Sequence, residues 1–95
     1  MNEMRVIIRP EAELDINDAY QWYESQRKGL GQNFLLCVEE ALSRASRKPN
    51  IHSIVHKNVR RVLIHRFPFG IFFIENEDYI SVLAVLHARR NPKMW

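Results

Sequence analysis

The sequence predicts an α+β domain in which a helical hairpin packs on one face of a mostly antiparallel, curved four-stranded sheet. The chain has 95 residues, the size of one small domain, so residues 1–95 are taken as a single unit. Two consecutive segments with helical spacing of apolar residues are joined by a glycine-containing turn, which is typical of an antiparallel helical pair. Three β-type segments follow with connections short enough for hairpins. The expected order is β-α-α-β-β-β.

A proline separates the first strand from the first helix. Val6-Ile7-Ile8 is a short β-branched segment between charged residues, which favours a strand. Pro10 suits the first position of a helix, and the acidic residues that follow complement the positive helix N-terminus. Apolar residues then recur at helical spacing over residues 11–27, namely Ala12, Ile16, Ala19, Tyr20 and Tyr23.

The second helix is expected from about Leu30 to Arg47. Gly29 or Gly31 can take the positive φ that ends the preceding helix, and Pro49 stops the second one. Its apolar residues cover one broad face: Leu30, Phe34, Leu35, Val38, Ala41, Leu42 and Ala45. Residues 49–58 show no clean periodicity and are interpreted as a loop.

Three strands are expected at residues 59–67, 69–75 and 79–87. The middle and last of these are apolar on both faces, although a helical hairpin covers only one face of a sheet. Either sheet curvature and the tail close the second face, or a partner covers it.

The alternation of side chains along the strands predicts a basic cluster on the open face. Val62 and Ile64 are expected to face the helices, which leaves Arg61 and His65 on the other side. On the last strand, a period of two places one set of side chains together, with Arg89 continuing the series: Tyr79, Ser81, Leu83, Val85 and His87. Such a cluster would bind phosphate, and an imidazole in it would act as general acid or base in RNA cleavage. The alternative is that these are ordinary solvated residues near strand ends.

The net charge of +3 is unevenly distributed. Residues 1–40 hold 4 Lys/Arg and 8 Asp/Glu, a sum of −4, whereas residues 41–95 hold 10 Lys/Arg and 3 Asp/Glu, a sum of +7. A basic C-terminal half indicates an anionic partner, either nucleic acid or an acidic protein segment. The alternative is a chain whose halves neutralise one another.

Several classes of protein are excluded or disfavoured. The single cysteine, Cys37, cannot form an internal disulfide, and no apolar run approaches the ~18 residues of a membrane span, so we expect a cytoplasmic protein with no membrane contact. His52 and His56 have the i, i+4 spacing of a metal pair but lack a third ligand, so no metal is expected. The glycines form no phosphate-binding loop, and no cofactor is expected.

A series of stretches along nearly the whole chain points to a family. The stretches are Val6-Ile7-Ile8-Arg9-Pro10-Glu11-Ala12, Asp15-Ile16, Trp22-Tyr23-Glu24, Gly29-Leu30-Gly31-Gln32-Asn33-Phe34-Leu35, Arg60-Arg61-Val62-Leu63-Ile64 and Arg66-Phe67-Pro68-Phe69-Gly70-Ile71. The closing stretch is the most specific one, Val82-Leu83-Ala84-Val85-Leu86-His87-Ala88-Arg89-Arg90-Asn91-Pro92 with terminal Trp95. In order and spacing they resemble the ParE branch of the RelE/ParE toxins of type II toxin–antitoxin modules.

The resemblance implies a small toxin with the β-α-α-β-β-β fold, held inactive in a tight complex with a cognate antitoxin. In this family a flexible, often acidic antitoxin segment wraps the toxin, and promoter DNA is contacted only through the antitoxin. Such a segment would cover the apolar strand surface and the basic half. The residues expected to bind the antitoxin are Trp22, Leu63, His65, Leu83 and Val85.

The family divides by activity. ParE-like members poison DNA gyrase, and the Arg89-Arg90-Asn91-Pro92 ending favours this branch, with growth inhibition as the outcome. The residues that would bind the target are Arg60, Arg61, Arg66, Arg89, Arg90, Lys93 and Trp95. RelE-like members cleave mRNA on the ribosome, in which case His87 would be general acid or base and Arg61 and Arg89 would contact phosphate. A third possibility is an inactive relative that only binds the antitoxin.

Overall fold

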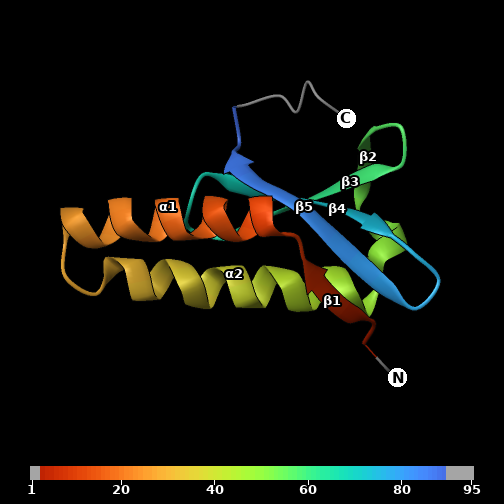
Figure 1. Cartoon of the computed structure of the whole chain (residues 1–95), viewed down its shortest axis with the longest axis horizontal. Helices are drawn as coiled ribbons and strands as arrows, with labels where there is room; N and C mark the ends of the chain where they lie inside the picture. The colour runs from red at the N-terminus through yellow and green to blue at the C-terminus, as the bar shows by residue number, and fades with distance from the viewer. Residues whose placement is uncertain (1–2, 90–95) are drawn as a thin grey trace.

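The two helices form an antiparallel hairpin that packs on one face of a mixed five-stranded sheet (Figure 1). The structure is a computed structural model and describes residues 3–89. Its elements are β1 (Arg5–Ile8), α1 (Pro10–Gln26), α2 (Leu30–Arg47), the 3-10 turn η1 (Pro49–Ile51), β2 (Ser53–His56), β3 (Val59–Leu63), β4 (Phe69–Glu75) and β5 (Tyr79–His87).

The strand order in the sheet is β1-β5-β4-β3-β2. β1 pairs parallel with β5, and all other neighbours are antiparallel. The helical hairpin carries the chain from β1 at one edge of the sheet to β2 at the other edge. The predicted α+β class and the helical hairpin are confirmed, and α2, β4 and β5 begin and end where the sequence placed them.

The prediction of four strands is wrong, because part of the expected loop at residues 49–58 is the edge strand β2. β2 pairs with β3 across a tight turn at Lys57, which has a φ of +49°, and the pairing shifts register between Ile54 and His56. That irregularity breaks the period of two by which strands are recognised. The strand predicted at residues 59–67 is also shorter than expected: it ends at Leu63, and Arg66 takes a φ of +72° in the connection to β4.

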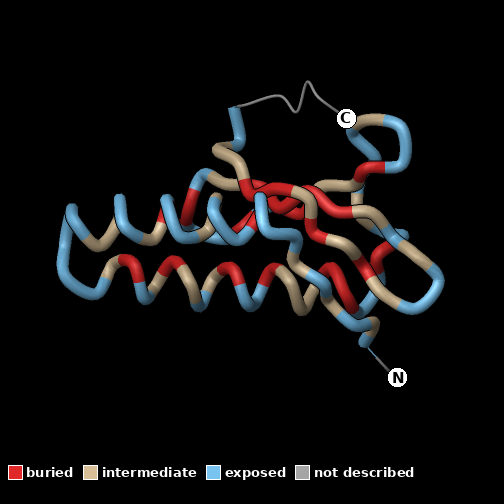
Figure 2. The backbone as a smooth tube through the Cα atoms, in the orientation of Figure 1, coloured by how far each residue is buried: buried red, intermediate tan, exposed pale blue. Residues whose placement is uncertain are grey.

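The main core lies between the helices and the sheet (Figure 2). Phe34 of α2 is fully buried, and its ring centroid lies 5.4 Å from that of Tyr23, 5.3 Å from that of Phe67 and 5.4 Å from that of Phe69. Burial among these rings raises the pKa of the Tyr23 hydroxyl above its ordinary value of 10.0. The aromatic cluster therefore joins α1, α2 and the start of β4.

A second apolar cluster lies on the sheet face away from the helices. Its buried members are Val59, Phe72 and Ala84, and Ile74, Leu83 and Leu86 pack against it half-buried. The prediction that the sheet is apolar on both faces is confirmed. The helical hairpin covers only one face of this sheet, so the apolar side chains of the other face are buried by other parts of the molecule or by a partner.

The hairpin loop is held by a carboxylate from α1. Glu24 accepts hydrogen bonds from the backbone N–H groups of Gly29, at 3.0 Å to its Oε2, and Gly31, at 3.0 Å to its Oε1. These amides belong to the start of α2, where backbone donors lack helical partners. Gly29 has a φ of +89°, and a Cβ on Gly31 would lie 2.8 Å from the ring of Tyr20. The carboxylate and the two glycines together explain why this stretch joins the helices so tightly.

We predict that Glu24→Ala lowers the free energy of unfolding by about 1 kcal/mol, because it leaves the first amides of α2 without a protein acceptor. Urea denaturation of both proteins measures the change. Glu39→Ala is the matched control, since Glu39 is exposed on α2, and its effect should stay within about 0.5 kcal/mol. Equal losses in the two variants would contradict a capping role for Glu24.

Candidate functional site

A bulge in β5 separates the residues predicted to cleave RNA. Phe72 pairs with Ala84 but Phe73 pairs with Val82, so Leu83 is an additional residue in β5. Beyond the bulge the faces are exchanged: Val85 lies in the helix-covered core with 2% of its surface exposed, and His87 pairs with Phe69.

His87 therefore lies on the helix-covered side of the sheet, where its ring centroid is 5.6 Å from that of Phe69. Arg61 lies on the opposite side, because it pairs with Phe72 of the second apolar cluster. The prediction that Leu83, Val85 and His87 share a face is wrong, and so is the predicted basic cluster, since Arg61 and His87 do not meet. Arg89 is exposed, and its backbone N–H lies 3.3 Å from Nδ1 of His87.

The side chain of Arg61 lies over Gly70 of the neighbouring strand β4. A Cβ built on Gly70 would lie 3.1 Å from Cδ and 3.2 Å from Cγ of Arg61. The absence of a side chain at Gly70 lets the aliphatic part of Arg61 lie over β4. Within residues 3–89 no ion-pair partner of Arg61 or of the exposed Arg66 is found, so both guanidinium groups are available to an anion.

Arg60, by contrast, has a structural role. Its Nη1 donates to the backbone carbonyl of His52 at 2.7 Å and to that of Asn50 at 3.3 Å. These bonds tie η1 and the start of β2 to β3. Among the predicted target-binding residues within residues 3–89, Arg60 is thus the one whose guanidinium group is hydrogen-bonded within the protein.

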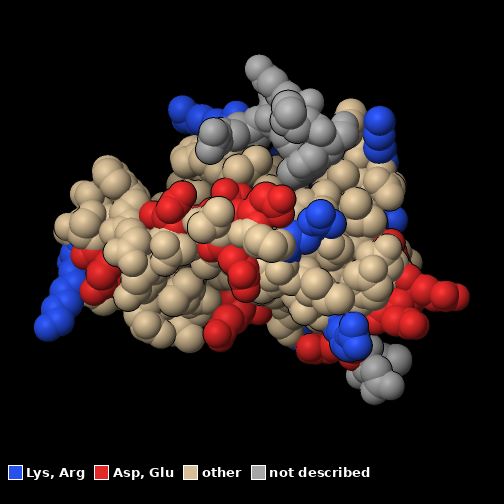
Figure 3. Space-filling view, viewed as in Figure 1, with Lys and Arg blue, Asp and Glu red and all other residues tan. Residues whose placement is uncertain are grey.

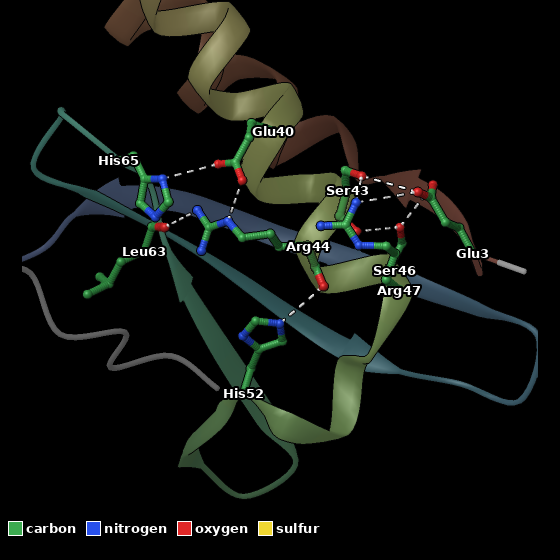
Figure 4. A network of polar contacts seen from close by, with 9 residues as sticks. All are labelled: Glu3, Glu40, Ser43, Arg44, Ser46, Arg47, His52, Leu63 and His65. Atoms are coloured by element: carbon green, nitrogen blue, oxygen red, sulfur yellow. Dashed lines mark hydrogen bonds and ion pairs between the residues drawn. The ribbon is translucent and has the colours of Figure 1, made fainter. Parts of the chain in front are cut away.

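A polar network joins the C-terminal half of α2 to the end of β3 (Figure 4). Glu40 accepts a hydrogen bond from Nε of Arg44 at 2.8 Å, and Nη2 of Arg44 donates to the carbonyl of Leu63 at 2.8 Å. Nδ1 of His65 lies 3.5 Å from Glu40. The hydrogen bond from Arg44 lowers the pKa of the Glu40 carboxyl below its ordinary value of 4.5, with the nearby positive charges contributing. His65 therefore lies beside the Glu40 carboxylate, a contact that the sequence analysis did not predict.

The remaining predicted residues lie in different parts of the molecule. Trp22 is 60% exposed on α1 and Leu63 is 49% exposed at the end of β3, so both are available to a partner. Leu83 is half-buried in the second apolar cluster. The predictions for Arg90, Lys93 and Trp95 lie outside the described residues.

Acidic and basic residues are unevenly distributed along the chain. Acidic side chains gather over the helical hairpin on the face shown in Figure 3. The α1 segment contains five acidic residues, namely Glu11, Glu13, Asp15, Asp18 and Glu24. From residue 41 to residue 74 the chain has seven Lys/Arg and no Asp/Glu. Those residues span the end of α2, the edge strand β2, its neighbour β3 and most of β4.

Neither a membrane span nor a metal-ligand cluster is found in the described part of the chain. Neither α1 nor α2 is both long and apolar enough to cross a bilayer. Across residues 3–89, no group of three or more His, Cys, Asp or Glu side chains is close enough to hold a metal ion.

Comparison with known proteins decides the family. The model of a family described as ParE toxin of type II toxin-antitoxin system, parDE, matches residues 6–92. The chain belongs to this family. Membership in a toxin–antitoxin family implies a cognate antitoxin as partner.

A chain from the chromosomal ParDE TA system of P. aeruginosa has a similar structure. The TM-score is 0.78 at 17% sequence identity, over 90% of this chain and 96% of that one. At this identity the likeness establishes the ParE-type fold. A search of curated protein sequences gives no match.

Some structurally important residues of this ParE toxin were not recognised from sequence. Asp15 accepts a hydrogen bond from the backbone N–H of Val85 at 3.0 Å and so joins α1 to β5. Glu24 and Glu40 were also missed. Asp15 and Glu24 belong to the stretches that carry the family resemblance, which is the one sequence signal that marked them.

We predict that Arg60→Met lowers the free energy of unfolding by about 1–2 kcal/mol, because two backbone carbonyls lose a charged donor. Arg61→Met keeps the aliphatic part over Gly70 and should stay within about 0.5 kcal/mol of the parent. Thermal and urea unfolding of both variants check this, and a larger loss for Arg61→Met would refute the assignment.

We also predict that Glu40→Gln destabilises the toxin at neutral pH by about 0.5 kcal/mol. The folded-state pKa of Glu40 is lower than the unfolded value, so its contribution is present above about pH 4.5 and is lost as the pH falls through the folded-state pKa. The difference in unfolding free energy between parent and variant should therefore close in acid. A series of urea titrations from neutral to acidic pH measures it, and a constant difference would exclude this linkage.

Proposed function

We propose that this ParE toxin inhibits growth by binding DNA gyrase and that a cognate antitoxin neutralises it in a tight complex. The family match over residues 6–92 supports the toxin role. The choice of gyrase over ribosomal mRNA is supported by one observation in the sheet: Arg61 and His87 lie on opposite faces. An RNA phosphate cannot contact both groups at once across a packed sheet.

Arg61, which is half-buried, and the exposed Arg66 are the best-placed described residues for the target. Both have no ion-pair partner within residues 3–89, and both belong to the acid-free segment from residue 41 to residue 74. Arg89 extends this set, and Arg90, Lys93 and Trp95 complete the proposal from sequence. For the antitoxin we retain Trp22, Leu63, His65 and Leu83 and omit Val85, which is buried.

The test is a supercoiling assay with purified gyrase, relaxed plasmid and purified toxin. We expect loss of supercoiling, accumulation of cleaved DNA and reversal by the antitoxin. The double variant Arg61→Glu/Arg66→Glu should lose at least tenfold in potency. Arg27→Glu/Lys28→Glu, which reverses the same number of charges on the exposed hairpin loop, should stay within twofold.

Two other outcomes distinguish the alternatives. Normal supercoiling together with ribosome-dependent mRNA cleavage that is lost in His87→Ala would replace gyrase with an interferase function. A folded protein that causes no growth defect on induction would indicate an inactive relative that only binds the antitoxin.

A further inference from the structure

The outer edge of the sheet carries an exposed apolar patch. β2 is the edge strand opposite to β1, at the end of the molecule away from the hairpin loop (Figure 1). Ile54 is 56% exposed, Val55 is 37% exposed and Ile51, in the preceding turn, is 68% exposed. We call these residues the β2 edge. Single exposed apolar residues are ordinary, but three within five positions, two on an edge strand and one in the turn before it, are typical of a contact with another chain.

The backbone of β2 can pair with an additional strand. Within the part of the chain that the structure describes, β2 pairs with β3 on one side and forms the border of the sheet on the other. An edge strand presents N–H and C=O groups to an incoming extended segment, while side chains of the edge select its sequence. β2 itself is held in place, because Arg60 donates to the carbonyls of Asn50 and His52 at its start.

Charge determines which occupant fits. The β2 edge lies within the acid-free segment that carries seven Lys/Arg, with Lys57 exposed in the turn that follows β2 and Lys48 exposed before η1. Two copies of this edge would bring like charges together, which opposes pairing of the toxin with itself. An extended segment with apolar residues and carboxylates would satisfy both the apolar side chains and the positive charge.

We propose that an acidic, extended segment of the cognate antitoxin adds to the sheet as a strand beside β2. This rests on the antitoxin complex proposed above and names the site and mode of part of that contact. Apolar antitoxin side chains pack on Ile51, Ile54 and Val55, and its carboxylates lie near Lys57 and the neighbouring cations.

The first measurement is hydrogen–deuterium exchange of the full toxin, free and in the purified complex with its antitoxin. We expect the backbone amides of residues 53–56 to exchange at least tenfold more slowly in the complex. Concentration-dependent protection of the same amides in the free toxin would instead assign the β2 edge to a second copy, and would overturn the proposal.

The second measurement is antitoxin affinity of edge variants. Ile54→Glu should weaken binding at least tenfold, and Ile54→Lys should weaken it less, because the proposed partner is acidic. Leu36→Glu is the matched control: Leu36 is 55% exposed, as Ile54 is 56% exposed, but it lies on α2, and this variant should bind within twofold of the parent. Thermal unfolding confirms that each variant is folded.

The outcomes separate this inference from the proposed function. A complex that forms with unprotected β2 amides, or that Ile54→Glu and Leu36→Glu weaken equally, would refute the β2 edge while leaving the antitoxin partner intact. A stronger loss for Ile54→Lys than for Ile54→Glu would refute an acidic partner segment. Absence of any complex with the antitoxin would refute both proposals.

Discussion

Burial of one phenylalanine organises the structure. Phe34 is fully buried on α2, and the rings of Tyr23 on α1, Phe67 in the β3–β4 connection and Phe69 at the start of β4 surround it. Aromatic rings contribute large buried areas and favour the tilted and edge-on contacts seen here. Because the three rings come from segments far apart in the chain, their packing sets how the hairpin lies on the sheet. The polar contacts of Asp15 and Arg44 then fix the two helices to β5 and β3.

The small size of the protein explains why its surface looks incomplete. A chain of 95 residues has one helical layer, yet its central strands carry apolar residues on both faces. A monomer of this size gains stability from burying both faces, and the remaining exposed large apolar residues within residues 3–89 lie on β1, α1 and α2, at the end of β3 and along the β2 edge. Membership in a toxin–antitoxin family gives this arrangement a reason, since the toxin is one half of a complex.

The cations of the basic half divide into two kinds. Arg44 donates to the carbonyl of Leu63 at the end of β3 and Arg60 to that of His52 before β2, whereas Arg61 and Arg66 have no ion-pair partner in the described part of the chain. This division cannot be seen in a charge count, because Arg60 and Arg61 are neighbours of the same type. It results from strand alternation, which directs adjacent side chains to opposite faces.

The sequence by itself determined the α+β class, the hairpin, the ends of α2, β4 and β5 and the family, because periodicity, Pro10, Gly29 and motif spacing are local signals. Tertiary structure decided the rest. The register shift in β2 hid a strand, and the additional residue at Leu83 moved Val85 and His87 to the helix-covered face. His65 met Glu40 only because β3 ends against α2. A one-residue shift in register exchanges the two faces of a strand, and that shift depends on pairing with β4, which no local pattern in β5 encodes.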